Sequence, residues 1–96
     1  MINDLNSVYM VGRLLYDPKV KGNNTLLKLV NSSYEYDKAK KEYIRKDAGF
    51  SVVYAGSEWD KLSGVVVKGV RVGVNGRLSP EGHIVCYAIQ LLDKSE

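Results

Sequence analysis

The sequence has few of the residues that build covalent or metal-held frameworks. It contains one cysteine, Cys86, and one histidine, His83, in 96 residues. A single cysteine cannot form an internal disulfide, and no cysteine or histidine spacing matches a zinc site. Because Cys86 stands in an apolar run, we expect a buried small hydrophobe rather than a nucleophile. We therefore expect no disulfide framework, no metal and no cofactor.

Long apolar runs are absent as well. No run approaches the roughly 20 residues that a membrane helix needs. Residues 1–5 lack the basic and apolar regions of a signal peptide. We therefore expect a cytoplasmic protein without membrane contact.

Motifs of catalysis are also missing. His83 stands beside a turn, and no second group is placed in the sequence to make it a base. The glycines of the segment 73–76 do not form a phosphate loop, because no Lys-Ser/Thr and no helix start follow them. We expect no enzymatic activity.

Tyrosine and basic residues, by contrast, are plentiful. The chain has seven tyrosines against one phenylalanine and one tryptophan, and its formal net charge is +3. A charge of this size fits a polyanionic partner but does not require one. The clustering is more informative, because Tyr36 and Tyr43 share one short segment with five cations: Lys38, Lys40, Lys41, Arg45 and Lys46.

Alternation of apolar and polar residues predicts strands, and turn residues separate them. A helix signal lies between Ser57 and Gly64. The composition of 36–47 favours a helix, although its place between two strands fits a hairpin arm equally well. The tail 93–96 is polar, and we expect it to fray. The predicted strands are 7–15, 25–36, 50–55, 65 or 70 to 78, and 83–92.

These elements predict one all-β domain over 1–96, with an ordered barrel at about 6–92. Five strands with a short helix between the third and the fourth match a small closed barrel of the oligonucleotide-binding (OB) type. We expect Trp59, near the start of the helix, to plug one end of the barrel.

The tripeptide Gly-Arg-Leu ends two of the predicted strands, at 12–14 and at 76–78. Glycine lets a barrel strand bulge or bend where a side chain would collide. We therefore predict bends at both glycines, with Leu14 and Leu78 in the core. Arg13 and Arg77 would then lie on the opposite face, beside each other if the two strands pair.

Three segments resemble bacterial single-stranded DNA-binding proteins. NSVYMVGRLLYDPKV, at 6–20, is similar to the opening strand of that family, and KGVRVGVNGRL, at 68–78, to its fourth strand. SVVYAGSEWDKL, at 51–62, resembles the third strand and the helix that follows it. The resemblance covers residues 6 to about 92 and implies an OB fold that binds single-stranded DNA.

The resemblance also implies assembly, and the chain departs from the family in two places. The family forms dimers or tetramers, so we expect a homo-oligomer, with a dimer favoured. The family's acidic tail with its apolar hook, which recruits replication and repair enzymes, has no counterpart in 93–96. The loop between the fourth and fifth strands is also short. These features resemble the tailless primosomal replication protein N branch, although that branch keeps a longer loop.

Binding single strands without reading sequence needs aromatic faces for the bases and cations for the phosphates. The candidate stacking residues are Tyr34, Tyr36, Tyr43, Phe50 and Tyr54. The candidate phosphate contacts are Arg13, Lys28, Lys38, Lys40, Lys41, Arg45, Arg71 and Arg77. Two alternatives stay open: Phe50 and Tyr54 as barrel core, and the basic run as a solvated arm.

The sequence thus predicts sequence-tolerant binding of single-stranded DNA in replication or recombination. The alternative is a protein-interaction barrel that serves as accessory subunit of a replication enzyme such as a polymerase, primase or helicase.

Overall fold

The computed structural model describes residues 5–92, so the predicted tail at 93–96 lies outside the described part. More than half of the described chain is strand, and it contains one four-residue helix. Its elements are β1 (Val8–Leu14), β2 (Lys19–Lys21), β3 (Asn24–Asp37), β4 (Glu42–Tyr54), α1 (Trp59–Leu62), β5 (Arg71–Leu78) and β6 (Ile84–Leu91).

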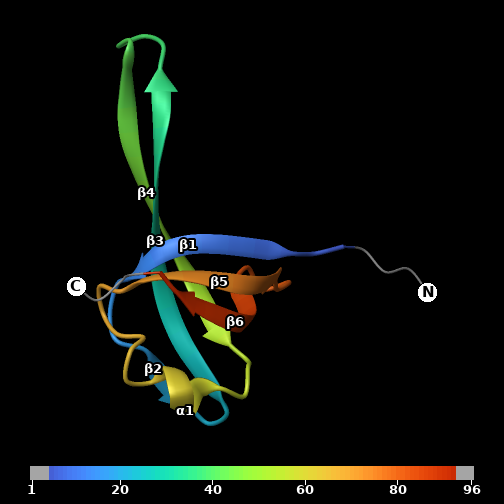
Figure 1. The fold of residues 1–96 in the computed structure, drawn as a ribbon. Coiled ribbons are helices and arrows are strands. Elements are labelled where there is room, and N and C mark those ends of the chain that lie inside the picture. The colour runs from blue at the N-terminus through green and yellow to red at the C-terminus, as the bar shows by residue number, and fades with distance from the viewer. Residues whose placement is uncertain (1–4, 93–96) are drawn as a thin grey trace.

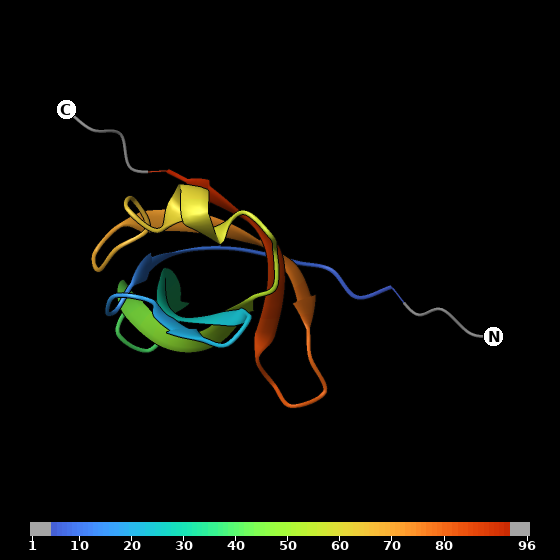
Figure 2. The same ribbon diagram turned by 90° about the horizontal axis from the view of Figure 1, so that it is seen from below.

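The strands form one sheet in the order β1-β5-β6-β4-β3-β2. An additional pairing of β1 with β3 closes the ring, so five strands enclose the core and β2 lies outside the ring on β3. Figure 2 shows the strands curling around one interior. The predicted five-stranded OB barrel is therefore confirmed, with α1 between the third and fourth barrel strands. The strand β2 was not predicted; it forms a hairpin with β3 across a turn at Gly22 and Asn23.

The core is filled by side chains from β1, β3, β4, β5 and β6 and from the segment before β5. The buried hydrophobic residues are Leu14, Leu27, Leu29, Val52, Tyr54, Val66, Val72, Val74, Ile84 and Cys86. Burying one aliphatic side chain of this size stabilises the fold by about 1.5–3 kcal/mol.

Two expectations about single residues are confirmed in the core. Trp59 packs against the core from α1, with its ring centroid 5.8 Å from that of Tyr54. Cys86 is fully buried, and burial raises the pKa of its thiol to about 12. No helix within residues 5–92 is long and apolar enough to cross a membrane.

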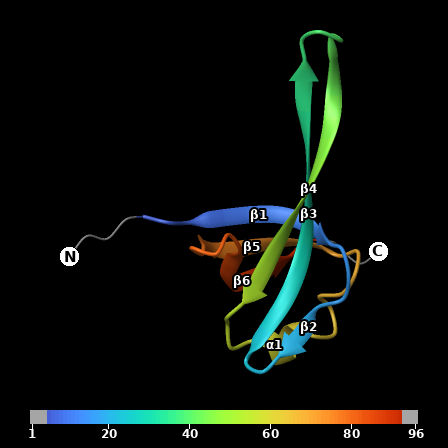
Figure 3. The same ribbon diagram turned by 180° about the vertical axis from the view of Figure 1, so that it is seen from behind.

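The ambiguous segment 36–47 is a hairpin arm. β3 and β4 pair without interruption from Thr25 with Tyr54 to Asp37 with Glu42. The two strands leave the barrel together and project far beyond it, as Figures 1 and 3 show from opposite sides. We call residues 31–48 of this ladder, with its turn, the arm.

Local turn chemistry explains why the arm is a hairpin despite its helical composition. The Asp37 carboxylate accepts hydrogen bonds from the backbone N–H groups of Ala39 (2.9 Å) and Lys40 (3.2 Å). Lys41 has a left-handed backbone, with φ at 56°, which a helix does not allow. Just below the turn, the rings of Tyr36 and Tyr43 meet edge to face at 5.1 Å. Such cross-strand aromatic pairs stabilise a two-stranded ladder.

Both glycines of the repeated tripeptide sit where the barrel leaves no room. A Cβ at Gly12 would lie 2.7 Å from the Val30 carbonyl oxygen, where β1 crosses β3. A Cβ at Gly76 would collide with the Val85 carbonyl oxygen and lie 2.6 Å from the Cys86 Cα. Gly76 also borders the register shift between β5 and β6. The predicted irregularity is therefore confirmed at Gly76. At Gly12, glycine is required because β1 and β3 pack closely.

The two leucines behave differently from each other. Leu14 is 2% exposed, as predicted, but Leu78 is 48% exposed. The prediction for Leu78 is wrong because the pairing of β1 with β5 ends at Gly76. Beyond that point β1 no longer covers β5.

Candidate nucleic-acid interface

The ladder of β3 and β4 gives the barrel and the arm one common outer face. Leu27, Leu29 and Val52 point into the core, so their neighbours of opposite parity point outward. The ladder has no register shift from Thr25 to Asp37, and this outer face therefore continues from the barrel along the arm. We call it the tyrosine face; it consists of Lys28, Val30, Ser32, Tyr34 and Tyr36 of β3 and of Tyr43, Arg45, Asp47, Gly49 and Ser51 of β4.

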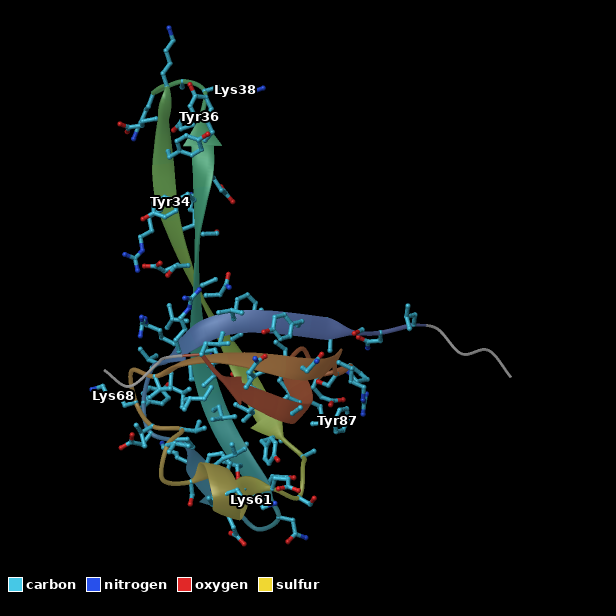
Figure 4. All side chains as sticks on the ribbon, viewed as in Figure 1. Tyr34, Tyr36, Lys38, Lys61, Lys68 and Tyr87 are labelled. Atoms are coloured by element: carbon cyan, nitrogen blue, oxygen red, sulfur yellow. The ribbon has the colours of Figure 1, made fainter. Side chains whose placement is uncertain are left out.

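Three predicted stacking residues lie together on the tyrosine face. Tyr34, Tyr36 and Tyr43 are 68%, 52% and 71% exposed. Tyr36 is the cross-strand partner of Tyr43, and Tyr34 that of Arg45. Figure 4 shows Tyr34, Tyr36 and Lys38 following one another toward the tip of the arm. The arrangement offers open aromatic rings next to a guanidinium, which suits unstacked bases and their phosphates.

At the tip, the predicted cations surround the turn. Lys38, Lys40 and Lys41 are exposed in the loop between β3 and β4. Because each ammonium group stands on a long flexible stem, these lysines can follow a phosphate chain without fixing its position.

Lys28 lies at the barrel end of the tyrosine face. Its ammonium group donates to the Ser51 hydroxyl at 3.3 Å. Beside it, a hollow of about 340 Å³ is lined from four parts of the chain: Tyr16, Asp17, Lys19, Leu26, Leu27, Lys28, Ser51, Val52, Val53 and His83. This hollow, which we call the loop hollow, is bounded by the loop after β1 and the loop before β6. Those two loops and the face between them are where OB folds bind oligonucleotides.

A second hollow, which we call the arginine hollow, opens where the arm leaves the barrel. It measures about 420 Å³ and brings three predicted cations together, Arg13, Arg45 and Arg71. Arg13 and Arg71 are cross-strand partners between β1 and β5. The other residues around it are Val11, Gly12, Val30, Asn31 and Ser32.

Arg45 is held by a short polar network. Its Nε donates to the Asp47 carboxylate at 2.9 Å, and the Ser32 hydroxyl donates to the same oxygen at 2.6 Å. These bonds lower the pKa of Asp47, with Ser32 the larger cause and Arg45 the second. The pKa of Arg45 is raised, first by its hydrogen bond to Asp47 and then by the charge of that carboxylate. The guanidinium therefore stays charged and oriented beside the arginine hollow.

The stacking prediction is wrong for Tyr54, and Phe50 is partly buried. Tyr54 is 2% exposed, packs on Trp59, and its hydroxyl accepts a hydrogen bond from the Glu58 backbone N–H. Phe50 pairs with Leu29 on the core-facing side of the ladder and packs against the core. The core alternative therefore holds for Tyr54, whereas Phe50 is only partly buried and its role in stacking stays a prediction.

The predicted pairing of Arg13 with Arg77 is also wrong. β1 and β5 are antiparallel, so Arg13 lies opposite Arg71 and Arg77 lies at the other end of β5. Arg13 donates to the Gly69 carbonyl at 2.8 Å, whereas Arg77 donates to the Tyr87 hydroxyl at 3.0 Å. Figure 4 shows Lys68, the neighbour of Gly69, and Tyr87 on opposite sides of the barrel. Arg77 is therefore set apart from the tyrosine face.

The opposite side of the arm has a different character. This reverse face consists of Asn31, Ser33, Glu35 and Asp37 of β3 and of Glu42, Ile44, Lys46 and Ala48 of β4. Three of these residues are acidic and none is aromatic. A polyanion is repelled by carboxylates, so the reverse face is unsuited to nucleic acid.

Several residues of the interface were not found from the sequence. Tyr16 and Lys19 form a cation–π contact at 5.9 Å and line the loop hollow together with His83. Their position directly after the first strand was the available signal, because OB folds use that loop. Asn31 and Ser32 gave no such signal, since small polar residues are common in strands that leave a core. Among residues 5–92, no group of three or more His, Cys, Asp or Glu side chains is placed to hold a metal ion.

Comparison with known proteins identifies the fold. No protein-family model matches the sequence, and no curated protein matches it significantly. Among solved structures, the Plasmodium falciparum SSB in complex with ssDNA superposes with a TM-score of 0.82 at 21% identity, over 97% of this chain and 99% of that one.

Two bacterial structures are similar as well. The small single-stranded DNA-binding protein of Streptomyces coelicolor gives a TM-score of 0.69 at 18% identity, over 96% of both chains. A deletion mutant of the single-stranded DNA-binding protein from Thermus aquaticus gives 0.69 at 19% identity, over 93% of this chain and 51% of that chain. The chain therefore has the OB fold of the single-stranded DNA-binding proteins, as its sequence motifs implied.

Proposed function

We propose that this protein binds single-stranded DNA with little sequence preference, through the tyrosine face. The observation that carries the proposal is the continuity of this face. Exposed tyrosines on the arm, the arginine hollow at its base and Lys28 on the barrel follow one another along one side of one ladder. The solved structures with this fold include an SSB bound to ssDNA.

Capture begins with charge in this mechanism. Lysines at the tip of the arm attract the phosphate chain, because each cation that neutralises a phosphate releases condensed counterions. Unstacked bases then settle on Tyr34, Tyr36 and Tyr43, at about 1–3 kcal/mol for each stacked base. Every base has a π-face, so this mode of binding tolerates any sequence.

The path of the strand follows from the two faces of the arm. The acidic reverse face repels the strand, and the tyrosine face leads it down to the arginine hollow and to Lys28. At the barrel, the loop hollow beside Lys28 receives the strand between the two loops. A role in replication or recombination fits a protein that covers transient single strands.

We also propose that the protein assembles as a homo-oligomer, with a dimer as its basic unit. The outer face of β1 carries Tyr9, which is 56% exposed and covers Gly73 of β5. A second copy at the Tyr9 end of the β1–β5 pair would cover this ring without covering the β3–β4 ladder or Arg13 and Arg71, which lie at the other end of the pair. Sedimentation velocity at micromolar concentrations tests the assembly, and a monomer mass would exclude it.

The binding proposal is tested with fluorescently labelled oligo-dT and with single-stranded oligonucleotides of mixed sequence. Fluorescence anisotropy at two salt concentrations should show binding that weakens with salt and differs little between sequences. A duplex of the same length should bind more weakly, because its bases cannot stack on the tyrosines. Absence of binding to every single strand at low salt would contradict the proposal and favour the protein-interaction barrel.

A further inference from the structure

The arginine hollow has the features of a built anion site. Five of its eight lining residues are polar, and three of these five are arginines. Its volume of about 420 Å³ falls within the roughly 300–1,000 Å³ typical of ligand sites. Arginine guanidinium groups present flat donor forks that match phosphate oxygens in pairs.

Hydrogen bonds within the fold position two of the three guanidinium groups, those of Arg13 and Arg45. The Gly69 carbonyl accepts from Arg13 at 2.8 Å. Asp47 and Ser32 hold Arg45 from the other side of the hollow. Arg71 stands directly across the ladder from Arg13, which brings both side chains to one face. Ordering these side chains in advance lowers the entropy that a ligand must overcome.

The floor of the hollow is fixed as well. The Asn31 side-chain amide donates to the Val11 carbonyl at 2.8 Å and ties β3 to β1 where the arm begins. Gly12 allows this approach, because any side chain there would meet the Val30 carbonyl. The close crossing of β1 and β3 is therefore also what brings Arg13 near Arg45.

We infer that the arginine hollow binds one phosphate group of the nucleic-acid strand and fixes it where the strand passes from the barrel to the arm. The inference rests on the proposed function, because the hollow lies between Lys28 and Tyr34 on the face that the strand follows. The phosphate is either a phosphodiester within the strand or a terminal phosphate. In both cases the hollow sets the register of the strand, whereas the tip lysines only attract it.

The experiment compares two double variants of the full chain. Arg13→Gln with Arg71→Gln removes two charges from the hollow. Lys61→Gln with Arg77→Gln removes two charges from parts of the barrel outside it, so both variants have the same net charge. Circular dichroism and thermal melting verify that each variant folds. A third variant, Arg13→Lys with Arg71→Lys, keeps the charge and removes the donor forks.

We expect the hollow variant to bind oligo-dT about tenfold or more weakly than the matched variant. The slope of its log affinity against log salt concentration should be smaller by about 0.7, the value of one lost phosphate contact on a single strand. The lysine variant should keep the slope and lose part of the affinity. Equal affinities of the hollow variant and the matched variant would overturn the inference while leaving strand binding intact.

Two further measurements distinguish an internal phosphate from a terminal one. They also test this inference separately from the proposed function. In NMR titrations, inorganic phosphate should shift the Nε–H signals of Arg13, Arg45 and Arg71 in the parent protein, and it should no longer shift the Arg45 signal in the hollow variant. Oligo-dT with a 5′-phosphate should bind as tightly as oligo-dT with a 5′-hydroxyl if the site takes an internal phosphodiester, and more tightly if it takes the terminal group. If oligo-dT does not bind while phosphate shifts these signals, the proposed function fails and the anion site stands. If phosphate shifts none of them, the anion site is refuted.

Discussion

The barrel and the arm share strands β3 and β4, but the two parts of these strands differ in burial. In the barrel half of β3 and β4, alternate residues are buried in a common core. In the arm, residues 31–48, no side chain is buried. Packing therefore decides the identity of the barrel residues. It does not decide the identity of the arm residues, which leaves them available for contact with another molecule.

Two tyrosines of β3 and β4 show the difference. Tyr54 is 2% exposed and Tyr34 is 68% exposed. The first fills the end of the barrel together with Trp59, and the second stands opposite Arg45 on the arm. A ring that is mostly exposed buries little apolar surface, so it stabilises the fold less than a core ring does. The comparison predicts that changes in the barrel alter folding and that changes in the arm alter binding.

The largest effect is expected in the barrel, at Gly76. Replacing Gly76 with Val forces a side chain into the backbone of Val85 and Cys86, so the strands must move apart. We expect the free energy of unfolding to fall by about 3 kcal/mol, in the range of severe core substitutions. Urea denaturation followed by circular dichroism measures this.

Gly64→Ala is the control for that change. A Cβ at Gly64 meets nothing within 4 Å and the residue has no left-handed backbone. Its effect should stay within about 0.5 kcal/mol. Equal losses at the two glycines would show that barrel closure does not depend on Gly76.

The next effect is expected in binding, at the aromatic pair of the arm. Tyr36→Ala with Tyr43→Ala removes two rings that touch no core residue. Binding of oligo-dT should weaken by about 2 kcal/mol or more, with an unchanged salt slope and a barrel that still folds. Tyr87→Ala is a matched control, because Tyr87 on the barrel is 52% exposed, as Tyr36 is. A larger loss of binding from the control would place the interface on the barrel side of β6.

A smaller effect on affinity, with a distinct salt signature, is expected at the tip. Lys38→Gln, Lys40→Gln and Lys41→Asn remove three charges, and Asn suits the left-handed backbone at position 41. The slope of log affinity against log salt should fall by about 2, at about 0.7 for each lost contact. Anisotropy titrations over a range of salt concentrations measure the slope. The control, Lys46→Gln on the reverse face, should change the slope by less than about 0.7, the value of one contact. An unchanged slope in the triple variant would show that the tip lysines do not contact the strand.

The smallest effect is expected at Asp47. Asp47→Asn removes a carboxylate that competes with the phosphates of the strand for Arg45. Binding should therefore tighten by a few-fold at neutral pH. The pKa of Asp47 is lowered by Ser32 and Arg45, so the carboxylate of the parent stays charged until the pH falls below its usual range. The advantage of the variant should therefore persist through mildly acidic pH and vanish only as the pH passes the lowered value. An affinity below that of the parent would show that the carboxylate is needed to orient Arg45.

Much of the fold could be predicted from the sequence, because alternation and turn residues are local signals. The five barrel strands, the short helix and the irregularity at Gly76 all follow from such signals. The state of 36–47 could not be decided, because its helical composition competes with a turn that depends on Asp37 and on the backbone of Lys41. The three-residue β2 was too short to show a period.

The site was predictable only in part. Tyr34, Tyr36 and Tyr43 stand among polar residues, and that local signal separated them from the core. Tyr54 and Phe50 have the same residue chemistry, but barrel closure decides their burial, and closure is a long-range property. The register of β1 on β5 likewise decided that Arg13 meets Arg71 and not Arg77. No local pattern in the sequence predicts that register.

Photocrosslinking tests the central claim, that single-stranded DNA lies on the tyrosine face, most directly. An oligo-dT that carries 5-iodouracil reacts preferentially with aromatic side chains on which its bases stack, and mass spectrometry of the digested complex identifies the residues. The account predicts cross-links at Tyr34, Tyr36 and Tyr43, and none at Tyr54 or Trp59. Cross-links confined to Tyr9 or Tyr87, on the β1–β5–β6 side of the barrel, would contradict it.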